Sequence, residues 1–471
     1  MRSGDQRVLL VAGVLGVLAQ TPLGPWSAGW FVLKPNRLVA GELFAPATVF
    51  APGSYALLGV WLALLVMALL PAGWSRVVAA PLAAVATLLT LYLCGHGATL
   101  LMADQPASAR VSLGIGFWVA LLACYVAWFA AAQLGAGARS YLLAPAAVIA
   151  TAGVVYLVAV GHFADLGLAR ELSAQGTDFS SELARHLALS GTSLLLGAAI
   201  GLPAAVLASR RADVAAWLLP TLAFFQTVPS LALFGILLPP LARLGQGVTL
   251  GTTLALGLLL LPLALLPWLG RPWLKVVVIV AAAVPALLYL TVIATTLSGV
   301  LAALLAGAAP APFGGAGPRL TQPLASLGVR GIGAAPALIA LTLYSLLPIV
   351  RNAYEGLRGV PEAAVQAGQG MGMSRRQVLL RVELPLALPL IFVGLRAAAV
   401  LIIGITTVAY LIGAGGLGVF IQRGIDQVVP DLVLLGALPV IALALLADGA
   451  LRAAGYLLCA PPLRRGRPRA A

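Results

Sequence analysis

Charged residues are scarce in this chain. Only 9% of its 471 residues are Asp, Glu, Lys or Arg, whereas 61% are hydrophobic, and soluble domains carry about 25% charge. This composition excludes a water-soluble globular protein. Apolar runs recur from end to end, and a run of about 20 residues crosses about 30 Å of hydrocarbon. Lipid accepts only helices or closed barrels, and the runs are continuous rather than alternating, so the sequence predicts an all-α polytopic membrane protein.

The residues of common catalytic and metal sites are rare as well. Cys94, Cys124 and Cys459 lie in or beside separate apolar runs, which indicates neither a disulfide framework nor a metal site. The three histidines have no carboxylate at a readable spacing. No phosphate-binding loop of the form GxxxxGK[ST] occurs, so the chain has no ATP site of the usual kind. We therefore expect no enzymatic activity, no cofactor and no metal, and any energy from ATP must come from a partner.

About twelve runs are long enough to be membrane helices. We predict spans at Arg7–Gly24, Ser54–Pro71, Val77–Met102, Val111–Leu134, Tyr141–His162, His186–Ser209, Ala215–Leu241, Val248–Leu269, Val276–Ala306, Ala335–Val350, Pro389–Ile412 and Leu432–Leu458.

The net charge is +14, and the positions of the basic residues indicate how the chain is oriented in the membrane, because cytoplasmic loops carry an excess of Lys and Arg. If the spans alternate, most basic residues fall on one side, and Lys34, Arg37 and Arg423 are among those that do not. Both termini are then cytoplasmic. Arg2 and Arg7 before the first apolar run also fit the start of a signal peptide, but no small-x-small cleavage site follows.

Two polar interruptions divide the chain. One has ordinary soluble composition and follows the fifth predicted span; the other is rich in Gly and Pro, which prevent helix or strand from persisting. The two apolar runs before the second interruption form an even pair, so they leave the orientation of later spans unchanged. We predict accessory helices at 1–165, a polar external linker at 166–185, a core at 186–460 with an inserted helix pair and loop at about 242–333, and a basic cytoplasmic tail at 461–471.

A basic, glycine-punctuated segment lies before the eleventh predicted span. Gly370 and Gly372 permit the positive φ of a sharp reversal, and Ser374 is suited to cap a second short helix. Pro385 and Pro389 are expected to break that helix before the membrane. The sequence predicts a short helical hairpin outside the bilayer, suited to lodging in a groove of another protein.

This segment resembles the coupling loop of the inner-membrane permeases of ABC importers. Their pattern is Glu-Ala-Ala, three residues, Gly, nine residues, an aliphatic residue, one residue, then Leu-Pro. The matching positions are Gln366, Ala367, Gly368, Gly372, Val382, Leu384 and Pro385. Gln366 replaces Glu and Gly368 replaces Ala, and the loss of the carboxylate weakens an ion pair to the ATPase. The alternative is an ordinary basic loop with small residues.

Further stretches resemble permeases of osmoprotectant importers, which carry glycine betaine, choline and related quaternary ammonium compounds. They are Phe225–Leu233, Ala337–Asn352, Gly370–Ser374, Glu383–Pro389 and Gly413–Gly418. The leading part resembles a branch with additional N-terminal helices. The resemblance implies a permease in the bacterial inner membrane, paired with a second permease subunit of the same or a related sequence. It also implies a cytoplasmic ABC ATPase dimer and an external or periplasmic substrate-binding protein.

Polar residues and glycines in the apolar core mark two further candidate sites. A polar group at membrane depth must face protein or a water-filled cavity, so we interpret Gln226, Thr227, Pro229 and Ser230 as part of a translocation path. The alternative is a structural kink satisfied by neighbouring helices. Four glycines after the eleventh span are a possible external gate or a plain tight turn: Gly413, Gly415, Gly416 and Gly418.

Other polar and aromatic residues have simpler interpretations. Asp448 and Arg452 are four residues apart, which predicts a pair on the helix surface. Six tryptophans fit an aromatic belt at the membrane interface; these are Trp26, Trp30, Trp61, Trp74, Trp118 and Trp128.

The runner-up function is a secondary transporter of a small solute driven by an ion gradient. Such proteins carry ionisable residues near the middle of the membrane and often an internal two-fold repeat, and neither is evident here. An ATP-driven importer of osmoprotectants is therefore the favoured function.

Overall fold

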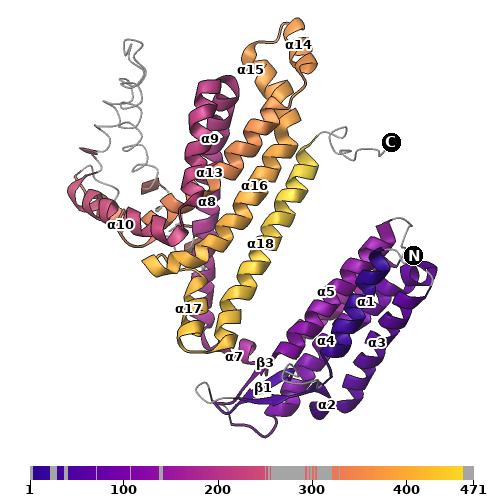
Figure 1. Ribbon diagram of the computed structural model, residues 1–471. Helices are drawn as coiled ribbons and strands as arrows, with labels where there is room; N and C mark the ends of the chain where they lie inside the picture. The colour runs from indigo at the N-terminus through magenta and orange to yellow at the C-terminus, as the bar shows by residue number, and fades with distance from the viewer. Residues whose placement is uncertain are drawn as a thin grey trace. The chain divides into compact units, whose positions relative to one another are not determined.

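The chain folds into two compact units (Figure 1). The first comprises Met1–Gly176 and Arg423–Leu435, and the second Thr177–Gln422 and Gly436–Ala471. The break at residue 176 lies inside the predicted polar linker. The computed structural model describes residues 4–21, 29–36, 41–70, 72–106, 108–136, 142–249, a few positions between 251 and 304, 321–327 and 329–459.

The first unit is a helical bundle around one apolar core. Its helices are α1 (Gly4–Leu18), α2 (Pro46–Val49), α3 (Ala51–Leu69), α4 (Ala72–Met102), α5 (Ile115–Ala136), α6 (Leu143–Ala159) and α7 (Gly167–Ala174). Helix α1 packs on α3 and α5, and α4 packs on α3, α5 and α6. Two of the tryptophans predicted to line the membrane interface, Trp30 and Trp61, are instead fully buried in this core, so that prediction was wrong for them. The indole of Trp30 donates to the carbonyl of Ala19 at 2.8 Å.

A small antiparallel sheet interrupts the otherwise helical first unit. Strands β1 (Phe31–Lys34), β2 (Glu42–Phe44) and β3 (Arg110–Leu113) lie in the order β2-β1-β3. The fourth predicted span, which began at Val111, is therefore too long: its first residues pair with β1, and the helix begins at Ile115.

The second unit is all helical in its described residues. It contains α8 (Gly176–Arg210), whose first residue belongs to the first unit, α9 (Ala212–Thr227), α10 (Ser230–Gly247), the 3-10 turn η2 (Leu324–Leu327), α13 (Ala334–Arg358), α14 (Glu362–Gly370), α15 (Arg375–Val378), the π-turn η3 (Leu379–Glu383), α16 (Leu384–Thr406), the 3-10 turn η4 (Thr407–Ile412), and most of α17 (Gly418–Asp426) and α18 (Pro430–Leu458). The end of α17 and the start of α18 belong to the first unit. Most of α13 is enclosed by α16, α9 and α10, whereas α18 exposes most of its apolar side chains. Figure 1 shows α14 and α15 at one end of this unit and α17 at the other.

The described helices confirm a helical membrane protein. Seven are long and apolar enough to cross a membrane, and α9 with α10 forms one bent pair. Two shorter apolar helices, Gln6–Leu18 and Leu143–Ala159, coincide with predicted spans. The predicted spans Val248–Leu269 and Val276–Ala306 lie largely outside the described residues, as do residues 307–320 and the tail. The count of twelve helices therefore stays a prediction.

Candidate functional site

The predicted hairpin is formed by α14 and α15. Pro361 precedes α14, and Gly372 has φ +78° in the turn between the two helices. Gly370 stays in the helix, so only one of the two glycines makes the reversal. The side-chain oxygen of Ser374 accepts from the backbone N–H of Gln377, while the Gln377 side chain accepts from the backbone N–H of Ser374. This capping box confirms the predicted cap.

Four of the seven motif residues show two different environments. Gly368 is buried, and a Cβ there would lie 3.5 to 3.6 Å from the side chains of Val382, Val378 and Met373. Gly368 and Val382 thus close the hairpin on itself. Gln366 and Ala367 are exposed, and the Gln366 amide donates to Glu362 at 3.1 Å.

The hairpin continues into the membrane helix without the predicted break. Helix α15, the π-turn Leu379–Glu383, α16 and η4 make one helix, Arg375–Ile412, of 38 residues. Pro385 lies in the first turn of α16. The π-turn shifts the hydrogen-bond register just before Pro385, so a residue without an N–H is tolerated there. The expected break at Pro385 was wrong for this reason, and the one expected at Pro389 was wrong as well, because Pro389 lies inside α16.

A buried carboxylate lies in the π-turn. Glu383 is 5% exposed, and its Oε2 pairs with the guanidinium of Arg210, the last residue of α8. Neither residue was predicted from the sequence to form a contact. The available signal was an acidic residue in the apolar stretch Val382–Pro385 and an arginine pair following the sixth span.

The candidate path residues lie at a break, not within one kinked span. Helices α9 and α10 meet at 102°. The Gln226 amide donates to the carbonyl of Tyr344 at 3.2 Å, and the Tyr344 hydroxyl donates to the carbonyl of Val228. The Thr227 hydroxyl donates to Phe224 at 2.7 Å. Proline at position 229 has no N–H to continue α9, and Tyr344 of α13 satisfies the carbonyl of Val228 at the break.

Three of the four candidate gate glycines form one turn, and the fourth, Gly418, begins α17. The backbone φ angles of Gly413, Gly415 and Gly416 are +74°, +77° and +94°, a conformation that residues other than glycine rarely adopt. The N–H of Gly416 donates to Oε2 of Glu182 on α8 at 2.5 Å.

Two more residues of α8 support this contact. Arg185 lies 3.3 Å from the other carboxylate oxygen of Glu182. His186 is buried, with Nε2 3.2 Å from the carbonyl of Ile403. A contact between α8 and the glycine turn was not predicted from the sequence, because the two segments are far apart in the chain.

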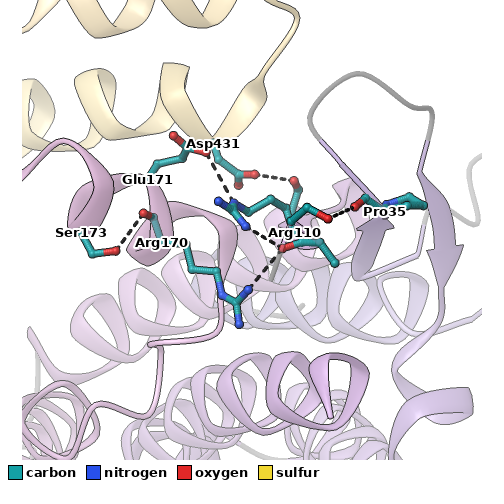
Figure 2. Close-up of polar contacts among 9 residues, drawn as sticks. Pro35, Arg110, Arg170, Glu171, Ser173 and Asp431 are labelled. Carbon is teal, nitrogen blue, oxygen red and sulfur yellow. Dashed lines mark hydrogen bonds and ion pairs between the residues drawn. The ribbon is translucent and has the colours of Figure 1, made fainter. Parts of the chain in front are cut away.

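A second polar cluster lies in the first unit (Figure 2). The Ser112 hydroxyl donates to Oδ2 of Asp431 at 2.5 Å, and Nε of Arg110 lies 3.7 Å from Oε1 of Glu171. Asp431 and Glu171 are 3% and 1% exposed, so both carboxylates are compensated inside the protein. This cluster ties the segment Arg423–Leu435, which leads into α18, to strand β3 and helix α7.

The predicted surface pair is confirmed on α18. Nη2 of Arg452 lies 3.1 Å from Oδ2 of Asp448, and Arg396 of α16 approaches the other oxygen at 2.7 Å.

Fold and geometry together define a polytopic helical membrane protein with a compact hairpin continuing one of its long apolar helices. Residues 256–454 match the family described as the binding-protein-dependent transport system inner membrane component. Residues 5–169 match the N-terminal domain of the ABC transporter permease YehY.

Relatives with assigned transport roles agree with these matches. The chain is 38% identical over 173 residues to the glycine betaine/carnitine/choline transport system permease protein OpuCB of Bacillus subtilis, covering 34% of this chain and 80% of that protein. It is 45% identical over 137 residues to the carnitine transport permease protein OpuCB of Listeria monocytogenes, covering 29% and 63%. It is 46% identical over 129 residues to the osmoprotectant import permease protein OsmW of Salmonella typhimurium, covering 27% and 60%.

The chain belongs to the family of inner-membrane permease components of binding-protein-dependent transport systems. The resemblance to osmoprotectant permeases is thereby confirmed, and the gradient-driven alternative is not favoured. The chain spans less than two thirds of the Listeria and Salmonella relatives.

Proposed function

We propose that this chain is the transmembrane permease subunit of an ATP-driven importer of osmoprotectants such as glycine betaine, choline or related quaternary ammonium compounds. The observation that carries the proposal is the hairpin α14–α15, whose second helix is the first part of the 38-residue helix Arg375–Ile412. The printed names of the relatives, which include glycine betaine, carnitine and choline permeases, support the substrate class.

The partners follow from what the chain exposes and from what its sequence lacks. Met371, at the tip of the hairpin, is 71% exposed, and methionine is an adaptable apolar contact. We propose that each hairpin lodges in one subunit of a cytoplasmic ABC ATPase dimer, because the sequence has no Walker loop. A second permease subunit completes the path, and an external or periplasmic protein delivers the substrate.

The orientation follows from the distribution of basic residues. Arg375, Arg376 and Arg381 in and beside the hairpin share the cytoplasmic side with both termini if cytoplasmic loops are the basic ones. The opposite side then holds the glycine turn at Gly413–Gly418 as the external gate. The break at Gln226–Ser230 lies on the translocation path between these ends.

Transport needs two states that differ in their contacts with the ATPase. Closure of the ATPase dimer on ATP displaces the hairpin, and the continuous helix Arg375–Ile412 carries that displacement toward the glycine turn. Access then changes from outward to inward.

The test is uptake into proteoliposomes that contain the permease, its ATPase and its binding protein, with ATP inside or outside. Radiolabelled glycine betaine and choline are the probes. Gly372→Val forces a β-branched side chain to adopt φ +78°, which costs about 1–3 kcal/mol, so this variant should insert normally and lose ATP-driven uptake.

Gly370→Ala is the matched control, because Gly370 is helical and a Cβ there meets nothing within 4 Å. It should transport normally. Full ATP-driven uptake by Gly372→Val would reject the hairpin as the coupling element, and uptake that needs an ion gradient but no ATP would reject the importer.

A further inference from the structure

Helix α8 has a carboxylate contact to a distant segment near each of its ends. Near its start, Glu182 accepts from the N–H of Gly416 in the glycine turn. At its last residue, Arg210 pairs with the buried Glu383 of the π-turn. Glu182 and Arg210 are about 40 Å apart along a continuous helix that rises 1.5 Å per residue. That distance is close to the thickness of a bilayer with its headgroups, about 40–45 Å.

The segment that receives both contacts is also continuous. Helix Arg375–Ile412 begins at the hairpin and ends one residue before Gly413. Between the two end contacts, Nε2 of His186 on α8 meets the carbonyl of Ile403 at 3.2 Å. Helix α8 and helix Arg375–Ile412 are thus two long rods joined at Glu383 and Ile403, and Glu182 joins α8 to the glycine turn that follows the second rod.

Each of the two helices contains a place where its regular hydrogen bonding is interrupted. Pro203 lies inside α8, and the second rod contains the π-turn Leu379–Glu383 and two prolines. A π-turn replaces the i→i+4 hydrogen bonds of the α-helix by i→i+5 bonds and is frequently found at functional sites. It is therefore the place where a pushed hairpin would tilt without moving α16. Because Glu383 is in that turn, its pair with Arg210 restrains the turn to α8.

We propose that Arg210, Glu383 and Glu182 are positioning residues for coupled transport: they join α8 and helix Arg375–Ile412 into one frame that carries hairpin movement to the glycine turn. This inference rests on the proposed function as an ATP-driven permease. The frame requires both end contacts. If the contact at Glu383 opens, the hairpin moves alone; if the contact at Gly416 opens, α8 moves without the turn.

The experiment measures solute uptake and ATP hydrolysis in the same proteoliposomes of the whole importer. Arg210→Ala should retain ATP hydrolysis and lower uptake per ATP by about tenfold, whereas Arg210→Lys, which keeps the charge, should recover most of it. Arg211→Ala is the matched control, because Arg211 is the exposed neighbour and its side chain makes no cap contact.

The other end of α8 is tested with two substitutions of Glu182. Glu182→Gln keeps an oxygen that accepts from Gly416, so it should stay coupled. Glu182→Ala removes the acceptor and should lower uptake per ATP as Arg210→Ala does. Opening either end already breaks the frame. Uptake per ATP in the double variant Arg210→Ala/Glu182→Ala should therefore be only slightly lower than in the worse of the two single variants.

Several outcomes would overturn the frame and leave the importer intact. One is normal uptake per ATP in both Arg210→Ala and Glu182→Ala. Another is a fall of uptake that is matched by an equal fall of ATP hydrolysis. A third is a double variant whose loss of uptake per ATP equals the product of the two single losses. A wild-type importer without ATP-dependent uptake would instead remove the proposed function itself.

Discussion

Replacing Ser112 by alanine removes the hydroxyl that donates to the buried carboxylate of Asp431. Asp431 is 3% exposed, so water cannot readily take the place of that hydroxyl. Gly167 packs so closely that a Cβ on it would lie 2.4 Å from Oδ2 of Asp431. The site therefore has little room to relax around the lost donor.

The expected cost follows from the kind of bond removed. A hydrogen bond to a charged group contributes about 1.5–3 kcal/mol, and a buried partner left without it adds a desolvation penalty. We expect about 2 kcal/mol, which is about 30-fold in an opening equilibrium since 1.4 kcal/mol is tenfold. The loss should be local, because structures open in cooperative segments. It should appear in β3 and in Arg423–Leu435.

The assay is amide hydrogen exchange of the detergent-solubilised full chain, read by mass spectrometry. Ser112→Ala should speed exchange in both segments. Ser108→Ala is the control, because its hydroxyl bonds the carbonyl of Pro35 at 3.1 Å in an exposed position, where a substitution costs at most about 0.5 kcal/mol. Equal exchange in the two variants would refute the conclusion that the buried contact holds the segment.

Three further substitutions test the second unit. Tyr344→Phe removes the donor to the carbonyl at the α9–α10 break and should destabilise the permease by about 1 kcal/mol, seen as a lower midpoint in chemical unfolding; an unchanged midpoint would contradict the role given to the hydroxyl. Gly415→Ala forces a residue with a side chain to adopt φ +77° and places its Cβ 2.5 Å from the Arg185 side chain, so it should abolish uptake. Gly404→Ala is the control, because a Cβ there meets nothing within 4 Å, and it should leave uptake unchanged. Equal uptake by the two variants would show that the glycine turn is not a gate. Gly368→Ala restores the family residue in an ordinary van der Waals gap and should stabilise the hairpin by about 0.5–1 kcal/mol, measured as slower proteolysis there, so faster cleavage would count against the packing described.

Local features were predictable from the sequence because their causes are local. Apolar runs marked the helices, since hydropathy acts residue by residue along a span. The cap of Ser374 depends on a residue three positions away, and the pair of Asp448 with Arg452 on one four positions away. Both contacts were found for that reason.

The small sheet was not predictable in this way. Its strands have only three or four residues, too few to show an alternating pattern, and Val32 pairs with Ser112 far along the chain. The fully buried Trp61 was misread for a related reason. Apolar side chains inside a helical bundle and at a lipid interface look alike until the neighbouring helices are placed.

The positions of the acidic residues allow some tertiary contacts to be predicted from the sequence. The chain has only 14 Asp and Glu residues, and a charge is costly in hydrocarbon unless it is paired. Glu171, Glu182, Glu383 and Asp431 each contact a segment distant in sequence or a basic partner. Glu182 and Asp431 lie near the starts of α8 and α18, and Glu383 lies in the π-turn just before α16.

A lone carboxylate at the end of an apolar run therefore predicts a tertiary contact, although not its partner. Identifying that partner requires the folded structure. Arg210 and Arg211 are equivalent in sequence, yet only Arg210 is seen to pair with Glu383 among the contacts described. This difference makes Arg211 a control for Arg210. If Arg211→Ala uncoupled transport as strongly as Arg210→Ala, the contact would owe its effect to net positive charge at the end of α8 and not to the geometry of one pair.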